Sequence, residues 1–142
     1  MEETTKAYLA GLFDGEGTIT LSRKTANSQF RYPVLSISST TLFLLELCKD
    51  TFGGHVSAQK VYKSHYKQSW SWKISFNSAI NAIEALLPYC REPDKCRRMK
   101  LILDRYKQVT PRSGRYTPDM IQEKLAFEEE FFHPSNSIAI KP

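Results

Sequence analysis

The sequence predicts an α+β fold with the element order αββαββα, in which helices cover one face of a four-stranded antiparallel sheet and leave the other face free. Three observations lead to this prediction. Polar and apolar residues alternate in two pairs of short segments, helical patterns precede and separate these pairs, and only helical patterns follow residue 77. The length of 142 residues, of which 41% are hydrophobic, suits a single domain over residues 1–142 with one core.

The first predicted element is a helix that is capped by Thr4 or Thr5 and runs to about Asp14. Two strands are predicted after it, "TITLSRK" (18–24) and "FRYPVLSISS" (30–39), because apolar residues recur at every second position. The side chains expected to face the core are Ile19, Leu21, Leu35 and Ile37.

The segment "TTLFLLELCKDTFGG" then predicts a short buried helix with Thr41 as its N-cap and Gly53-Gly54 at its end. Two more strands are predicted at 55–63 and 68–76. Their expected core residues are Val56, Ala58, Trp70, Trp72, Ile74 and Phe76. Helical patterns follow at about 78–89, 94–109 and 117–132, the last with a Thr117 cap and Pro118 at its first position.

The positive charge is concentrated in residues 17–77, which hold eight basic residues against Glu46 and Asp50 alone. This stretch is the candidate anion-binding surface, with an ordinary solvated basic face as the alternative. No apolar run is long enough to cross a membrane and the first residues are acidic, so we expect a soluble, intracellular protein. The three cysteines are interpreted as reduced packing residues, and the scattered histidines do not indicate a zinc site.

Small residues form a stripe on the first predicted helix, because Ala7, Gly11 and Gly15 follow one another at intervals of four. Such a stripe lets a second helix backbone approach closely. The same helix in a second subunit is one partner, since a two-fold contact is self-complementary. A later helix of the same chain is the other.

Two carboxylates stand near the exit of this helix. Asp14 still lies in the helical pattern, where a locally hydrogen-bonded acid is ordinary. Glu16 is expected just beyond the helix end, between Gly15 and Gly17. The negative end of the helix dipole disfavours a carboxylate there, but a bound divalent cation reverses that balance. Glu16 is therefore a candidate oxygen ligand for Mg²⁺.

The segment Leu9-Ala10-Gly11-Leu12-Phe13-Asp14-Gly15-Glu16-Gly17 resembles the LAGLIDADG motif of the homing endonucleases. With the αββαββ pattern behind it, the resemblance covers residues 5 to about 109. It implies motif helices paired at the centre of a dimer or of a two-repeat chain, and a saddle of two sheets in the major groove. It also implies metal-dependent cutting of both strands of DNA, an activity linked to intron or intein mobility. Because the chain contains one copy of the motif, the resemblance implies a homodimer, in which each subunit supplies one motif helix.

The resemblance also implies roles for individual residues. Glu16 matches the catalytic acid that binds Mg²⁺, for which Mn²⁺ is expected to substitute. Gly15 matches the preceding residue, whose backbone carbonyl helps to bind the metal. Lys95 stands where many members carry a lysine near the scissile phosphate, with Arg97 and Arg98 as alternatives. The dimer contact falls on Ala7, Gly11, Leu12 and Gly15. Ser39-Thr40 departs from the glutamine-lysine pair that relatives often carry.

The partner is predicted to be double-stranded DNA with a pseudo-palindromic site. Strands of about ten residues span about 33 Å, which corresponds to about 20 base pairs for a dimer. Base contacts are expected from the outward-facing Thr18, Thr20, Ser22, Lys24, Tyr32, Ser36, Ser57, Gln59, Ser71 and Lys73. Phosphate contacts are expected from Arg23, Lys60, Lys63, Lys67, Arg112 and Arg115.

Two other functions fit parts of the sequence. A relative that does not cut, acting as an RNA-splicing cofactor (maturase) or a DNA-binding regulator, is favoured by Ser39-Thr40 and disfavoured by the retained Glu16 and Lys95. A purely structural interaction domain would explain the small-residue stripe but not the free basic face.

Overall fold

The structure is a computed structural model that describes residues 2–61, 63 and 66–134. Its elements follow the predicted order, with short additional turns after α3 and α4. They are α1 (Glu3–Glu16), β1 (Gly17–Ser22), β2 (Tyr32–Ser39), α2 (Leu42–Phe52), β3 (His55–Ala58), β4 (Trp70–Ser75), α3 (Phe76–Leu86), the 3₁₀ turn η1 (Leu87–Tyr89), α4 (Pro93–Leu101), the π-helical turn η2 (Ile102–Tyr106) and α5 (Pro118–Phe132).

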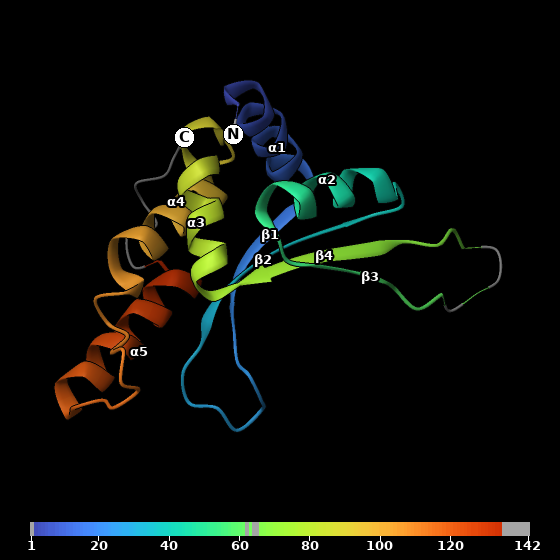
Figure 1. Ribbon diagram of the computed structural model, residues 1–142. Helices are drawn as coiled ribbons and strands as arrows, with labels where there is room; N and C mark the ends of the chain where they lie inside the picture. Colours follow the sequence, from blue (N-terminus) through green and yellow to red (C-terminus); the bar gives the residue numbers. More distant parts are fainter. Residues whose placement is uncertain (1, 62, 64–65, 135–142) are drawn as a thin grey trace.

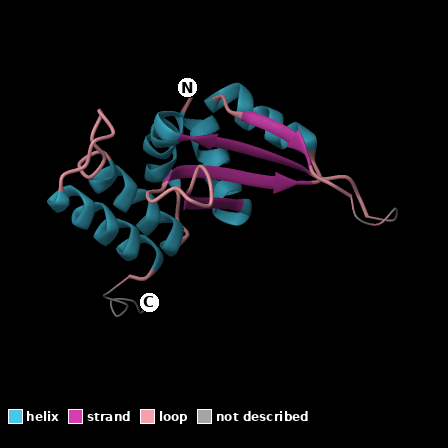
Figure 2. Ribbon diagram, turned by 90° about the horizontal axis from the view of Figure 1, so that it is seen from below, coloured by secondary structure: helices cyan, strands magenta, loops and turns pink. Residues whose placement is uncertain are grey.

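The four strands form one antiparallel sheet in the order β1-β2-β4-β3. Helices α1, α2 and α3 lie on one side of it (Figure 1), and the view from below looks onto the other side (Figure 2). The predicted fold class is confirmed, and the free face is the one that carries the outward side chains of the strands. None of the described helices is long and apolar enough to span a bilayer.

The core lies between this sheet and the helices. Leu9, Ala10 and Phe13 of α1 pack into it together with Leu35 of β2 and the large indole of Trp72 of β4. The predicted inward faces of the first two strands are confirmed, because Ile19, Leu21, Leu35 and Ile37 are all buried. Alternation along the strands therefore identified the buried face correctly.

Two glycines end α2 as predicted, with φ angles of 84° at Gly53 and 93° at Gly54. The carbonyl oxygen of Gly53 accepts a hydrogen bond from Trp72 Nε1 at 2.9 Å. A Cβ atom at Gly54 would lie 2.5 Å from the carbonyl oxygen of Lys73, so a larger residue has no room there. The glycine pair lets the chain turn directly from α2 into β3 against the strand beside it.

The first helix differs from its prediction at both ends. It begins at Glu3 with Glu2 as N-cap, so neither Thr4 nor Thr5 caps it. It ends at Glu16, and Gly17 leaves it in an extended conformation with φ −85°. Glu16 is therefore the last residue of α1 rather than a residue beyond it.

The second pair of strands is shorter than predicted. Strand β3 ends at Ala58, and this residue is exposed because it lies at the end of the edge strand. Phe76 is the first residue of α3 with a positive φ of 54°, so it leaves the core side of the sheet and is 43% exposed. Both residues were predicted to be buried, and both predictions are wrong.

The three helical predictions at the C-terminal half are confirmed in position. Thr117 Oγ1 accepts a hydrogen bond from the backbone N–H of Met120 at 3.2 Å, as expected of the N-cap of α5. All three cysteines are free, and Cys48 and Cys90 are buried. Burial raises the pKa of the Cys90 thiol to about 12, which suits a packing role.

Candidate active site

The two carboxylates at the exit of α1 have different surroundings. The Asp14 carboxylate accepts hydrogen bonds from the backbone N–H groups of Arg91, at 2.9 and 3.1 Å, and of Glu92, at 3.1 Å. Glu16 is exposed and makes no hydrogen bond or ion pair with any residue that the structure describes. Asp14 is thus occupied in joining two segments of the fold, whereas the oxygens of Glu16 remain available to a ligand.

Lys95 lies beside the same helix end. Its Nζ donates hydrogen bonds to the carbonyl oxygens of Phe13, at 3.1 Å, and Asp14, at 2.7 Å. The carboxylate of Glu92 caps α4 by accepting from the backbone N–H groups of Asp94 and Lys95. Lys95 therefore lies in the first turn of α4, and it places a positive charge at the negative end of the α1 dipole.

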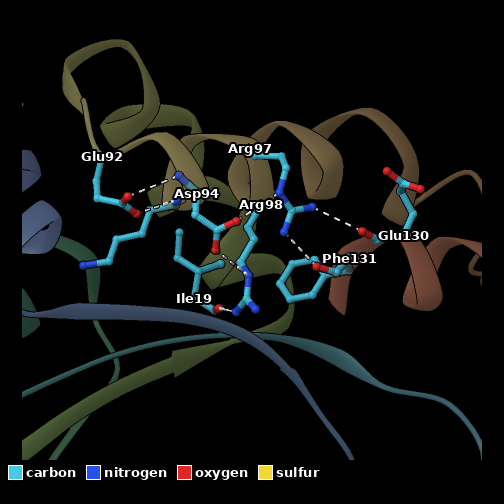
Figure 3. Close-up of polar contacts among 8 residues, drawn as sticks. Ile19, Glu92, Asp94, Arg97, Arg98, Glu130 and Phe131 are labelled. Atoms are coloured by element: carbon cyan, nitrogen blue, oxygen red, sulfur yellow. Dashed lines mark hydrogen bonds and ion pairs between the residues drawn. The ribbon is translucent and has the colours of Figure 1, made fainter. Parts of the chain in front are cut away.

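Arg97 and Arg98, the alternatives to Lys95, lie on α4 and point away from the exit of α1 (Figure 3). Arg98 Nη1 donates to the carbonyl oxygen of Ile19 at 2.7 Å, and its guanidinium lies 4.6 Å from the ring centroid of Phe131. Arg97 donates to the carbonyl oxygens of Glu130 and Phe131 at the end of α5. Both arginines hold β1 and α5 to α4, so Lys95 is the better candidate.

An open groove of about 590 Å³ lies in front of Glu16. Ser39 and Thr40 line it, so the pair that departs from the family pattern does lie next to the acid. The Ser39 hydroxyl accepts a hydrogen bond from the backbone N–H of Thr41 at 2.9 Å. The other lining residues are Leu12, Ser38, Leu44, Gln59 and Ser69.

The donors available to a metal ion at this groove are oxygen atoms, which suits Mg²⁺ better than a softer metal. Glu16 supplies one carboxylate. Within the described part of the chain, no three His, Cys, Asp or Glu side chains come together as a possible metal site. Within the described residues, Glu16 is therefore the one acid that lines this groove.

The free face of the sheet carries most of the predicted base contacts. The register places Thr18, Ser36 and Lys73 in one row across β1, β2 and β4, and adds His55 of β3, which the sequence analysis overlooked. Among the predicted residues of this face, the exposed ones are Thr18, Lys24, Ser57, Gln59 and Lys73, and the half-buried ones are Thr20, Ser22, Tyr32 and Ser36.

Ser71 is the exception on this face, because it is only 7% exposed. It lies on the inner strand β4 between Ser38 of β2 and Ser57 of β3. The amide of Gln59 reaches across β4 to the hydroxyl of Ser38 at 3.4 Å. This bridge covers Ser71, so Ser71 does not offer the base-reading surface that was predicted.

The basic residues predicted to hold phosphates lie in loops around this face. Arg23 follows β1, and Arg112 and Arg115 lie between η2 and α5. All of the predicted phosphate contacts are exposed, namely Arg23, Lys60, Lys63, Lys67, Arg112 and Arg115.

The stripe of small residues on α1 has no partner within the described chain. Ala7, Gly11 and Gly15 are exposed, and a Cβ atom added at either glycine would meet nothing within 4 Å. Leu12 is half-buried, and Tyr8, next to the stripe, is 54% exposed. Packing of the stripe against a later helix of the same chain is therefore contradicted.

A family model described as LAGLIDADG endonuclease matches residues 9–92, from the motif helix to the start of α4. The chain belongs to the LAGLIDADG endonuclease family. A comparison with curated protein sequences finds no significant match.

Solved structures of homing endonucleases share the fold of this LAGLIDADG protein. I-CvuI, in complex with its target in the presence of calcium, superposes with a TM-score of 0.70 at 20% identity, over 92% of this chain and 81% of its own. I-TnaI gives a TM-score of 0.64 at 18% identity over 93% and 90% of the two chains. I-CeuI, complexed with DNA, superposes with a TM-score of 0.63 at 18% identity, over 90% of this chain and 66% of its own.

Proposed function

We propose that this LAGLIDADG protein is a site-specific endonuclease that acts as a homodimer and hydrolyses one phosphodiester bond in each strand of duplex DNA. The proposal rests on the exposure and position of Glu16. It is an exposed acid without a partner among the described residues, it lies at the end of the motif helix, and it faces a groove beside the free sheet face. A solvated carboxylate in that place suits metal binding more than folding.

The homodimer follows from two incomplete features of the single chain. The small-residue stripe of α1 lacks a partner within the described chain, and the metal site has one carboxylate. Pairing α1 with its copy covers the stripe and brings two Glu16 side chains toward a common centre. The same arrangement extends the free faces of the two sheets into one DNA-binding saddle.

Each residue of the site then has a chemical role. Glu16 and the adjacent Gly15 carbonyl would hold Mg²⁺, or Mn²⁺ in its place. A divalent cation so held polarises a phosphate and lowers the pKa of a bound water. Lys95 fixes the end of α1 and contributes positive charge near the phosphate. The hydroxyls of Ser38, Ser39 and Thr40 hydrogen-bond water in the groove.

The substrate is duplex DNA of about 20 base pairs with approximate two-fold symmetry, read by the side chains of the free face. Two of the similar proteins, I-CvuI and I-CeuI, are seen in complex with DNA. The hydroxyl-rich face offers Gln59 for adenine and Lys24 or Lys73 for guanine, so bridging water is expected to complete the readout.

The test is selection from a randomised duplex library in Mg²⁺ and, separately, in Ca²⁺, with sequencing of cleaved and bound fragments. The wild type should cut a selected site in Mg²⁺, and Glu16→Gln should bind it with unchanged affinity but leave it intact, because the amide keeps the size and loses the charge. Glu46→Gln, an exposed acid of α2, is the matched control and should cut as the wild type does. Cleavage by Glu16→Gln at the wild-type rate would refute the metal assignment.

A second function, that of a non-cleaving splicing cofactor (maturase) or DNA-binding regulator, is favoured by one observation. Ser39 and Thr40, which replace the polar pair common in relatives, line the groove next to Glu16. If the wild type binds a selected site tightly but leaves it intact in both Mg²⁺ and Mn²⁺, this second function replaces the first.

A further inference from the structure

Two adjoining cavities lie at the other end of the sheet from Glu16. The larger, of about 770 Å³, is lined by Asn77, Lys107, Gln108, Pro111 and Arg112. The smaller, of about 210 Å³, reaches to α5. They share Phe76, Tyr106 and Thr110, and we refer to the two together as the aromatic hollow. The hollow lies where the start of β2, the start of α3 and the segment 106–116 meet.

Aromatic rings form much of the wall of this hollow. Tyr32 stacks on Phe76 with ring centroids 4.2 Å apart and an angle of 8° between the rings. Phe30 and Tyr116 form a second pair, with centroids 4.3 Å apart. Because Phe76 rests on Tyr32 and is still 43% exposed, its remaining surface is open to the larger cavity that it lines. It offers an aromatic platform at the edge of the free sheet face.

The backbone conformation at Phe76 is unusual for a residue with a large side chain. Among the described residues it is the one non-glycine residue with a positive φ, 54°, and a bulky side chain is disfavoured there. The sharp turn from β4 into α3 accounts for the φ angle, and glycine or asparagine would make that turn with less strain. Phenylalanine at this position places a ring at the larger cavity, although its positive φ angle would favour a smaller residue.

The charge of the hollow is positive. Lys107 and Arg112 are exposed at the larger cavity, and neither pairs with a carboxylate within the described chain. Lys124 is 1% exposed at the smaller cavity, where its Nζ donates to Thr110 Oγ1 at 2.5 Å and lies 4.2 Å from the ring centroid of Tyr106. Of the described residues, no aspartate or glutamate lines either cavity.

The buried ammonium of Lys124 points to an anionic ligand. Burial lowers the pKa of Lys124 to about 8, because its charged form is poorly solvated there. The negative charge of Glu128, one turn further along α5, acts in the opposite direction and offsets part of this cost, and the same carboxylate accepts a hydrogen bond from the backbone N–H of Arg31. An anion in the hollow would offset the cost of burying this charge.

We propose that the aromatic hollow binds an unpaired nucleotide of a single-stranded nucleic acid, with the base stacked on Phe76 and its phosphates held by Lys107 and Arg112. A flat ring combined with cations and amides is the chemistry that recognises an unstacked base and its backbone. Asn77 and Gln108 offer amide groups to the base edge. Bases within a duplex already stack on one another, so the ring of Phe76 would take an unpaired base, whereas Lys24, Tyr32 and Arg112 border the hollow and are also among the residues predicted to contact duplex DNA.

The test is fluorescence anisotropy with fluorescein-labelled oligo(dT) and oligo(U), at low salt, on the full chain. Phe76→Gly removes the ring and suits the positive φ, so the fold should persist, while binding of single strands should weaken about 5- to 100-fold. Phe76→Tyr keeps the ring and should bind as the wild type does. Stronger binding of oligo(U) than of oligo(dT) would identify RNA as the source of the nucleotide, and the reverse would identify DNA.

A second pair of variants tests the charge. Arg112→Ala should weaken binding of both oligonucleotides more than Lys49→Ala, which removes the same charge from the exposed surface of α2. Equal binding of single strands by the wild type and Phe76→Gly would overturn the proposal, as would absence of binding by the wild type. Cleavage of a selected duplex is measured on the same samples at saturating protein. Phe76→Gly leaves Glu16 and Lys95 in place and should still cut, so the proposed nuclease activity is tested independently of single-strand binding.

Discussion

The ammonium of Lys95 lies 2.7 Å from the carbonyl oxygen of Asp14, and this contact joins the start of α4 to the end of the motif helix. Asp14 adds a second connection between the same two segments, since its carboxylate accepts hydrogen bonds from the backbone N–H groups of Arg91 and Glu92. The position of Glu16, two residues further along α1, therefore depends on groups that lie almost eighty residues away in the sequence.

Replacing Lys95 by methionine should affect both catalysis and folding. The carbonyl oxygens of Phe13 and Asp14 lose a charged donor, so we expect the free energy of unfolding to fall by about 1–3 kcal/mol. Cleavage should slow by about 10²- to 10³-fold, as for loss of one electrostatic donor. Urea denaturation and single-turnover cleavage measure the two effects. Lys100→Met, an exposed lysine of the same helix, should change neither, and wild-type cleavage by Lys95→Met would refute the role.

Asp14→Asn should destabilise the fold, in contrast to Glu16→Gln. The amide retains one acceptor oxygen but loses the charge that strengthens the bonds from Arg91 and Glu92, which predicts a loss of about 1–3 kcal/mol in the free energy of unfolding. Hydrogen exchange of the Arg91 amide should accelerate in Asp14→Asn. If Asp14→Asn is as stable as the wild type while Glu16→Gln is not, the roles of the two carboxylates are reversed.

Local patterns were sufficient to predict most of the fold. Period-two alternation identified Ile19 and Leu35 as core residues, because each strand has one buried face. Gly53-Gly54 marked the end of α2, because glycine is favoured where the backbone leaves a helix with a positive φ angle. Thr117 marked the start of α5, because its hydroxyl accepts a hydrogen bond from an amide that has no partner within the helix. Spacing along the first helix likewise identified the stripe of Ala7, Gly11 and Gly15, whereas Glu16 was predicted one step beyond the helix that it ends.

Contacts between distant segments could not be predicted in this way. The carboxylate of Asp14 is fixed by amides 77 and 78 residues along the chain, and no local pattern reports them. Phe76 fits strand alternation but leaves the core because α3 begins at this residue without a linker. Lys124 did carry a signal, since it shares the buried face of α5 with Phe127 and Phe131 at helical spacing. A lysine at an apolar position is a sign of a buried polar contact.

Gly11→Leu should separate folding from association. In one chain a Cβ atom added at position 11 meets nothing within 4 Å, and leucine favours the helix by up to about 1 kcal/mol over glycine, so the monomer should fold at least as well. Across a close α1–α1 contact, the same side chain holds the two helices apart. Sedimentation should show a dimer for the wild type and a weaker dimer for Gly11→Leu. Asn81→Leu on the exposed side of α3 is the control and should remain dimeric. A wild type that sediments as a monomer with its DNA would refute the pairing.

Lys124→Met should stabilise the protein at neutral pH. Burial lowers the pKa of Lys124 from the usual 10.5 to about 8, so the folded chain holds this proton less tightly than the unfolded chain does. The cost of the buried charge is therefore fully present below about pH 8 and disappears as the pH rises to 10.5. At about 1.4 kcal/mol per pKa unit, less the lost hydrogen bond to Thr110, the variant should be more stable by about 1–3 kcal/mol at pH 7.

The advantage of Lys124→Met should shrink as the pH is raised from 8 to 10.5, because the wild type then folds with a neutral amine. Urea denaturation of both proteins across this range measures the difference directly. Lys107→Met removes an exposed lysine nearby and should show no such dependence on pH. A constant difference between Lys124→Met and the wild type from pH 7 to 10.5 would mean that the Lys124 ammonium is as well solvated in the fold as in the unfolded chain. The hollow would then lack the buried charge that favours an anion within it.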